Sequence, residues 1–160
     1  MSYLKNLTLC SVSLWLGFMG FFSFAAAPAI FTTLDRERAG SLVTAVLPRY
    51  YLFGIIMGLL ALGGVLGRAM LKRRKEVGWG ALVLALLMLA LTAYSLLVLL
   101  PQAEGARLAM RSVPASGAMV SEAALAFGRA HRLAVILNLL TMLAGLALVL
   151  VEGLRPPPSP

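Results

Sequence analysis

The stretch at residues 79–100, WGALVLALLMLALTAYSLLVLL, decides the fold of this chain. It contains no charged residue, and as a helix it would be about 33 Å long, enough to cross a hydrocarbon core about 30 Å thick. Apolar stretches of similar length lie at residues 7–31, 49–67 and 131–152. A helix satisfies its own backbone polar groups, so such runs are typical of transmembrane helices.

The composition agrees with four membrane spans in a single domain. Of the 160 residues, 61% are hydrophobic and 12% are charged, against about 25% charged in soluble domains. We therefore predict an all-α fold, an integral membrane four-helix bundle with up-down topology. The single four-span domain covers residues 1–153, and residues 154–160 form a proline-rich tail.

Basic residues set the expected orientation. Residues 68–75 hold the densest positive charge, which places the second loop in the cytoplasm by the positive-inside rule and both termini with it. The net charge of +8 is then flanking charge that contacts anionic lipid headgroups, and we expect no nucleic-acid partner. The expected location is a bacterial inner (plasma) membrane, crossed several times.

Prolines and charges suggest where the helices begin and end. Pro28 is expected to kink or end the first helix, and Pro101 to close the third. Residues 32–47 carry mixed charge and are predicted to form a loop or short interfacial helix, after which Pro48 opens the second helix. Residues 102–130 are predicted to form a long loop with an amphipathic segment on the membrane surface.

Glycines on two helices indicate close packing. Gly17 and Gly20 lie on a small-residue face of the first helix, and Gly54 and Gly58 form a GxxxG pattern in the second. Small residues allow helix backbones to approach closely in lipid, so all four are predicted to serve helix packing.

The fourth helix has a polar stripe that includes His131, Asn138 and Thr141. Polar side chains in a span usually face the bundle, where an amide can link helices. For His131 four readings stay open: an interfacial hydrogen bond, a ligand contact at the bundle mouth, proton transfer, or axial ligation of haem. If His131 ligates haem, the second axial ligand would be Met57 or Met88, or it would be absent.

The chain lacks the constellations that membrane enzymes and ion-coupled carriers use. Cys10 is the only cysteine, so no thiolate cluster forms from one chain. No carboxylate lies in the middle of a span, and no catalytic motif is present, so we predict neither a metal site nor an enzyme. The six carboxylates are Asp35, Glu37, Glu76, Glu104, Glu122 and Glu152.

Three blocks, Pro28–Leu34, Leu47–Tyr51 and Phe127–His131, followed by Asn138, resemble the transmembrane protein 205 family. The resemblance implies a four-span membrane protein; animal relatives are linked to membrane trafficking and platinum-drug resistance. The residues that match the family pattern are Phe31, Leu34, Gly40, Pro48, Tyr50, Arg129, His131 and Asn138.

The expected function is binding without catalysis. Tyr50, Arg129 and His131 fall on one side of the membrane in the predicted topology and are expected to form a polar mouth. There the protein would bind a partner, a lipid or a small molecule, or it would serve as an accessory subunit. Expected partners are membrane lipids and other membrane subunits or a second copy. The alternative is a haem-binding or redox bundle that uses His131; otherwise no cofactor is expected.

Overall fold

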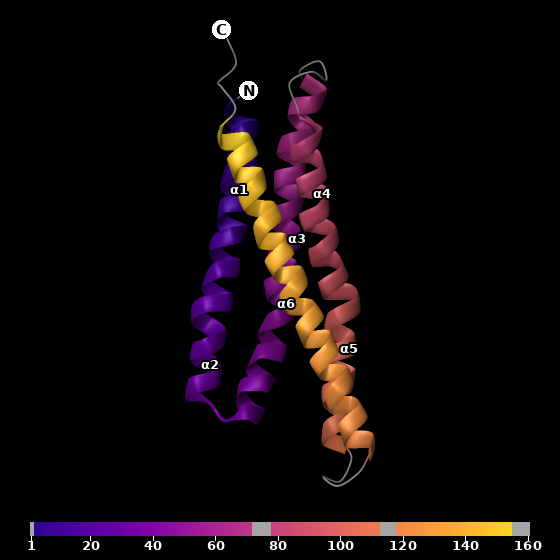
Figure 1. Cartoon of the computed structure of the whole chain (residues 1–160). Coiled ribbons are helices and arrows are strands. Elements are labelled where there is room, and N and C mark those ends of the chain that lie inside the picture. Colours follow the sequence, from indigo (N-terminus) through magenta and orange to yellow (C-terminus); the bar gives the residue numbers. More distant parts are fainter. Residues whose placement is uncertain (1, 72–77, 113–117, 155–160) are drawn as a thin grey trace.

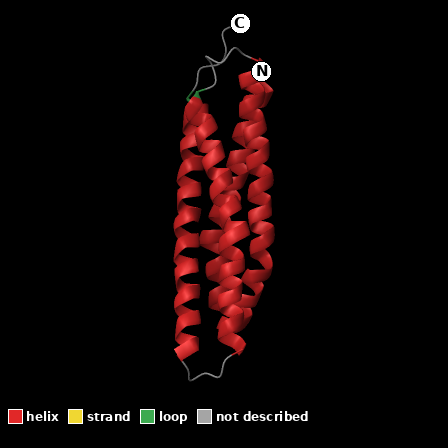
Figure 2. Cartoon of the chain, turned by 90° about the vertical axis from the view of Figure 1, so that its right-hand side faces the viewer, coloured by secondary structure: helices red, strands yellow, loops and turns green. Residues whose placement is uncertain are grey.

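The computed structural model describes residues 2–71, 78–112 and 118–154 of the chain. Four long helical segments run in alternating directions beside one another (Figures 1 and 2), so the predicted all-α bundle is confirmed. The first helix begins and the last helix ends at the same end of the bundle, here called the terminal end. The opposite end, where the chain turns at residues 34–35, is the turn end. The basic residues at 72–75 and the tail at 155–160 lie outside the described residues.

The helical segments are longer than the predicted spans. Both α3 and α6 have 36 residues and are therefore about 54 Å long, well beyond the hydrocarbon core. The elements in chain order are α1 (Ser2–Phe21), the π-helical turn η1 (Phe22–Ala26), α2 (Ala27–Thr33), α3 (Arg36–Leu71), α4 (Trp79–Tyr94), the π-helical turn η2 (Ser95–Leu99), α5 (Leu100–Ser112) and α6 (Ala118–Gly153).

The prediction that Pro101 closes the third helix is wrong, and Pro28 does not end the first. Each proline is preceded by a π-helical turn and one further residue. In these turns the N–H of Ala27 bonds to the carbonyl of Phe22, and the N–H of Leu100 bonds to the carbonyl of Ser95. A proline cannot donate to the carbonyl four residues back and its ring clashes with it. The wider turn accommodates the proline, and the helix continues.

Of the two alternatives predicted for residues 32–47, the loop is wrong over most of the range, because only Leu34 and Asp35 interrupt the helices and the rest is helical. The Asp35 carboxylate accepts the backbone N–H groups of Glu37 at 3.2 Å and Arg38 at 3.0 Å. This is an N-cap, which satisfies donors that have no partner inside the helix. Consequently α3 starts at Arg36, and Pro48, predicted to open the helix, lies inside it.

The long loop predicted for residues 102–130 is wrong over the described residues, which are helical up to Ser112 and again from Ala118. Instead α5 continues from the third span and packs against the first part of α6 (Figure 1). These packed helices are longer than a hydrocarbon core requires, since each apolar stretch is only about 20 residues long.

Each helix of the bundle contacts two neighbours along its length. α1 packs between α3 and α6, and α4 packs against the other side of both. α3 and α6 are therefore diagonal to each other, and no Cα atoms of this pair approach within 8 Å. Contacts between the diagonal helices must be made by long side chains.

Trp15 of α1 lies against the glycines of α3. A Cβ atom added at Gly54 would lie 2.8 Å from the Trp15 indole nitrogen, and one at Gly58 would lie 3.0 Å from its ring. Gly54 and Gly58 therefore serve helix packing inside the chain. Around Gly17 and Gly20 no atom of another described segment lies within 4 Å of such a Cβ, so these two glycines make no close helix contact within the described residues.

The closest α1–α3 approach gives a matched pair of substitutions. A Cβ at Gly64 would lie 2.8 Å from the carbonyl oxygen of Leu4, whereas Gly63 faces open space. Gly64→Ala should reduce the free energy of unfolding by about 1–3 kcal/mol, because backbone atoms must move. Gly63→Ala should leave it unchanged or raise it by up to about 1 kcal/mol through helix propensity. Reversible unfolding in bicelles measures both, and equal effects would contradict the packing described here.

Candidate functional site

A cluster of hydrogen-bonding side chains lies inside the bundle toward the turn end. The Tyr50 hydroxyl donates to Asn138 Oδ1 at 2.6 Å, and Asn138 Nδ2 donates to Ser23 Oγ at 3.1 Å. This chain of bonds joins the segment that follows α1 to α3 and α6. We call the whole cluster the polar centre; its members are Ser23, Tyr50, Tyr51, Thr92, Ser95, Asn138 and Thr141.

Local structure places two of these side chains. Ser23 lies in the π turn η1 and Ser95 in the π turn η2, and such turns often occur at functional sites. The Tyr50 ring is held by the rings of Phe22 and Tyr51, at centroid distances of 4.9 and 5.2 Å. The polar centre is thus fixed by the proline-linked turns on two segments and by an aromatic cluster on a third.

The polar centre has no charged member. It offers hydroxyl and amide groups, which suit hydrogen bonding to neutral groups and to other helices. In the described ranges no group of three or more His, Cys, Asp or Glu side chains that could hold a metal ion occurs.

A buried ion pair lies near the terminal end. Arg68 Nη1 of α3 is 2.5 Å from Glu152 Oε2 of α6, and the two side chains are 11% and 0% exposed. Arg68 Nε also donates to the carbonyl of Gly64 at 3.3 Å. The sequence interpretation counted Arg68 with the basic loop and placed Glu152 at the end of a span, and it missed this pair. A glutamate placed directly after a long apolar run was the available signal.

At the turn end an arginine joins α5 to the first part of α3. Arg107 donates to the carbonyl of Gly40 at 2.7 Å, to Ser41 Oγ at 2.7 Å and to the hydroxyl of Thr44. Arg111 adds a bond to Ser41 at 3.2 Å. Gly40, named among the family-like positions, thus contributes its backbone oxygen to the contact that holds the extended helices together.

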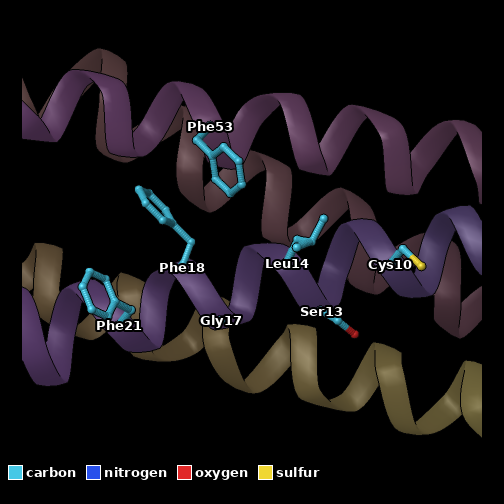
Figure 3. Close-up of a pocket in the computed structure, with 7 residues that line it drawn as sticks. All are labelled: Cys10, Ser13, Leu14, Gly17, Phe18, Phe21 and Phe53. Atoms are coloured by element: carbon cyan, nitrogen blue, oxygen red, sulfur yellow. The ribbon is translucent and has the colours of Figure 1, made fainter.

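A shallow, widely open apolar hollow of about 670 Å³ lies on the outer face of α1 (Figure 3). Phe18 of α1 and Phe53 of α3 approach each other along one side, with ring centroids 4.7 Å apart. We call this hollow the α1 groove; it is lined by Cys10, Ser13, Leu14, Gly17, Phe18, Phe21 and Phe53.

The predicted mouth is not assembled. Tyr50 and Asn138 meet, but Arg129 and His131 are exposed. In the described part of the chain His131 stacks on Phe127 of its own helix at 6.2 Å and does not contact Tyr50. His131 lies two helical turns before Asn138, about 10 Å along the axis.

The other residues singled out in the sequence lie apart from the polar centre. Phe31 and Pro48 are exposed. Met88, considered as a second haem ligand, packs at Gly145. That glycine is 14 residues beyond His131, which is about 21 Å along α6.

The long apolar helices and their antiparallel packing define a four-span membrane protein. The chain belongs to the family described as "Domain of unknown function (DUF4149)", whose match covers residues 10–112. An uncharacterized protein of Aquifex aeolicus (strain VF5) is 36% identical over 101 residues, 63% of this chain and 70% of that protein. No solved structure was found to match the chain.

The Tyr50–Asn138 bond predicts a measurable coupling between α3 and α6. Tyr50→Phe and Asn138→Leu should each destabilise the bundle, and the double variant should lose less than the sum of the two. Interhelical bonds in membranes average about 0.6 kcal/mol and reach about 1.7 kcal/mol. A double-mutant cycle from unfolding in bicelles measures this energy; a value of zero would show that the bond contributes nothing.

Single substitutions in the buried ion pair should lower the free energy of unfolding more than those in the Tyr50–Asn138 bond. Glu152→Leu leaves the Arg68 charge buried without its carboxylate, and a loss of about 3 kcal/mol is expected. The double variant Arg68→Met, Glu152→Leu should recover most of this loss, because it removes both charges. Arg38→Ala, which breaks the exposed pair with Asp35, is the control and should change little. If the double variant were as unstable as Glu152→Leu alone, the unpaired charge of Arg68 would not be the cause of the lost stability.

Proposed function

We propose that this protein is a non-enzymatic membrane subunit that binds a transmembrane helix of another polypeptide in the α1 groove. The observation that carries this proposal is an apolar hollow on a small-residue helix face that no part of the described chain covers. Specific assembly in lipid depends on such close packing, since lipid tails give apolar helices no hydrophobic reason to associate.

The unequal burial of the four spans supports the proposal. Only 11% of the span in α1 is buried, against 22% to 33% in the other three. α1 is thus the helix with the most surface left for a partner.

The floor of the groove has the composition that helix contacts in membranes use. Ser13 and Gly17 are four residues apart and therefore share one face of α1. This small-xxx-small spacing lets a second backbone approach closely. Leu14 and Phe21 stand exposed beside it and would pack along the sides of an inserted helix.

The position of the groove favours a helix over a lipid chain. The uncharged part of α3 runs beside α1 from Thr8, which meets Gly64, to Phe22, which meets Tyr50. The groove extends from Cys10 to Phe21 and therefore straddles the middle of the membrane. An acyl chain from one leaflet ends near that middle, whereas a spanning helix crosses it.

We assign the protein to a bacterial inner membrane with the terminal end in the cytoplasm, on the strength of the basic residues near Arg68. The resemblance to the transmembrane protein 205 family is compatible with a binding role. That likeness rests partly on Arg129, His131 and Asn138, which lie beyond the matched residues 10–112.

Filling the groove should release the partner while the fold is kept. Gly17→Leu projects a side chain into open space, and so does the control Gly63→Leu on the outer surface of α3. Native mass spectrometry of protein extracted in mild detergent should show a second polypeptide, another copy or a different chain, on the wild type and on Gly63→Leu. Gly17→Leu should be bare.

Two results would contradict the proposal. One is a wild-type chain that carries no polypeptide, and the other is a Gly17→Leu variant that keeps it. Unchanged helicity and thermal stability of both variants would show that the loss of the partner is not a loss of the fold.

A further inference from the structure

A small internal cavity lies within the polar centre. Side chains from all four spans line it, and all of them except Asn138 are buried. The lining residues are Trp15, Met19, Tyr50, Tyr51, Thr92, Ser95, Asn138 and Thr141. The cavity is partly enclosed, and its lining combines polar with apolar surface, so an occupant that hydrogen-bonds to the polar part would be stabilised there.

The cavity is large enough only for a very small occupant. The space open to the centre of a water molecule is about 10 Å³, which corresponds to roughly one water. A drug-sized ligand needs about 300 Å³ or more. The cavity is thus matched to a single water molecule and to no larger compound.

Three hydroxyl oxygens that line the cavity can each accept a further hydrogen bond; that of Ser95 also has a side-chain bond to Tyr51. Thr92, Ser95 and Thr141 each donate their hydrogen to the carbonyl four residues back, at 2.8 to 2.9 Å. Their oxygens retain lone pairs that can accept from a water. They belong to α4, η2 and α6, so one water could join two segments.

A buried indole provides a donor. Trp15 is 2% exposed, and within the described ranges its N–H has no acceptor among the hydrogen bonds of the protein. An indole N–H is a donor only and usually finds a partner when buried. Together with the hydroxyl oxygens it supplies the two to four partners that an internal water requires.

We propose that this cavity binds one structural water molecule, which accepts the Trp15 indole N–H and donates to two of the hydroxyl oxygens of Thr92, Ser95 and Thr141. The water links α1 to the α4 and α6 side of the bundle next to the Tyr50–Asn138 bond. This site is independent of the α1 groove, which lies on the outer face of the same helix.

The two tryptophans of the chain make the test selective. The protein, labelled with ¹⁵N at the indoles, is placed in lipid bilayers, and magnetisation transfer from water is measured by proton-detected solid-state NMR. Trp79 is 72% exposed and reports bulk water, whereas Trp15 reports the cavity. Trp15 should receive strong transfer despite its burial.

Substitutions assign the water to the cavity. In the variant Thr92→Val, Ser95→Ala, Thr141→Val, transfer to Trp15 should fall at least fivefold while transfer to Trp79 stays unchanged. The control variant Thr32→Val, Thr33→Val removes exposed hydroxyls outside the cavity and should behave as the wild type. Absence of transfer to Trp15 in the wild type, which needs no variant to fold, would overturn the proposal. So would undiminished transfer in the triple variant.

Discussion

The contact of Trp15 with the glycines of α3 is the constraint on which the rest of the bundle depends. Lipid offers no hydrophobic drive between apolar helices, so close backbone approach must be provided by small residues. Gly54 and Gly58 provide it for the indole, and Gly64 provides it for the backbone of α1 near Leu4. Because α1 and α3 are fixed in this register, Tyr50 faces the bundle axis and can reach the opposite helix.

Two polar contacts then connect the helices that are diagonal to each other. The Tyr50–Asn138 bond lies toward the turn end and the Arg68–Glu152 pair lies near the terminal end. Both join α3 to α6, whose backbones do not meet. A bundle held by neighbour contacts alone could shear along its diagonal, and these two contacts near the ends of the membrane-crossing part oppose that motion.

The sequence was sufficient for the four spans and their antiparallel order. It also singled out Gly54, Gly58, Tyr50 and Asn138, which the structure places in helix contacts. It misplaced helix ends at Pro48 and Pro101, because rules for soluble helices treat proline as a boundary. In a membrane bundle, π turns and neighbouring helices compensate for the missing N–H.

The remaining differences come from the tertiary arrangement. His131 and Asn138 share a helical face on a straight wheel, but α6 crosses the bundle and packs against α5 at the turn end (Figure 1). The face that meets Tyr50 at Asn138 is therefore exposed at His131. The pairing of Arg68 with Glu152, 84 residues apart, likewise depends on how the helices pack. Gly17 and Gly54 both lie on small-residue faces of apolar helices. The sequence therefore could not show that Gly17 faces outward and Gly54 faces inward.

Gly54, Gly58 and Gly64 of α3 are used inside the chain, whereas Gly17 and Gly20 of α1 face outward, and this contrast underlies the proposed role as a helix-binding subunit. The most direct test is photo-crosslinking in native membranes from a benzoylphenylalanine introduced at position 17, with position 63 as the reference. The account predicts a defined protein adduct from position 17 and only lipid adducts from position 63. Lipid adducts alone from both positions would contradict it.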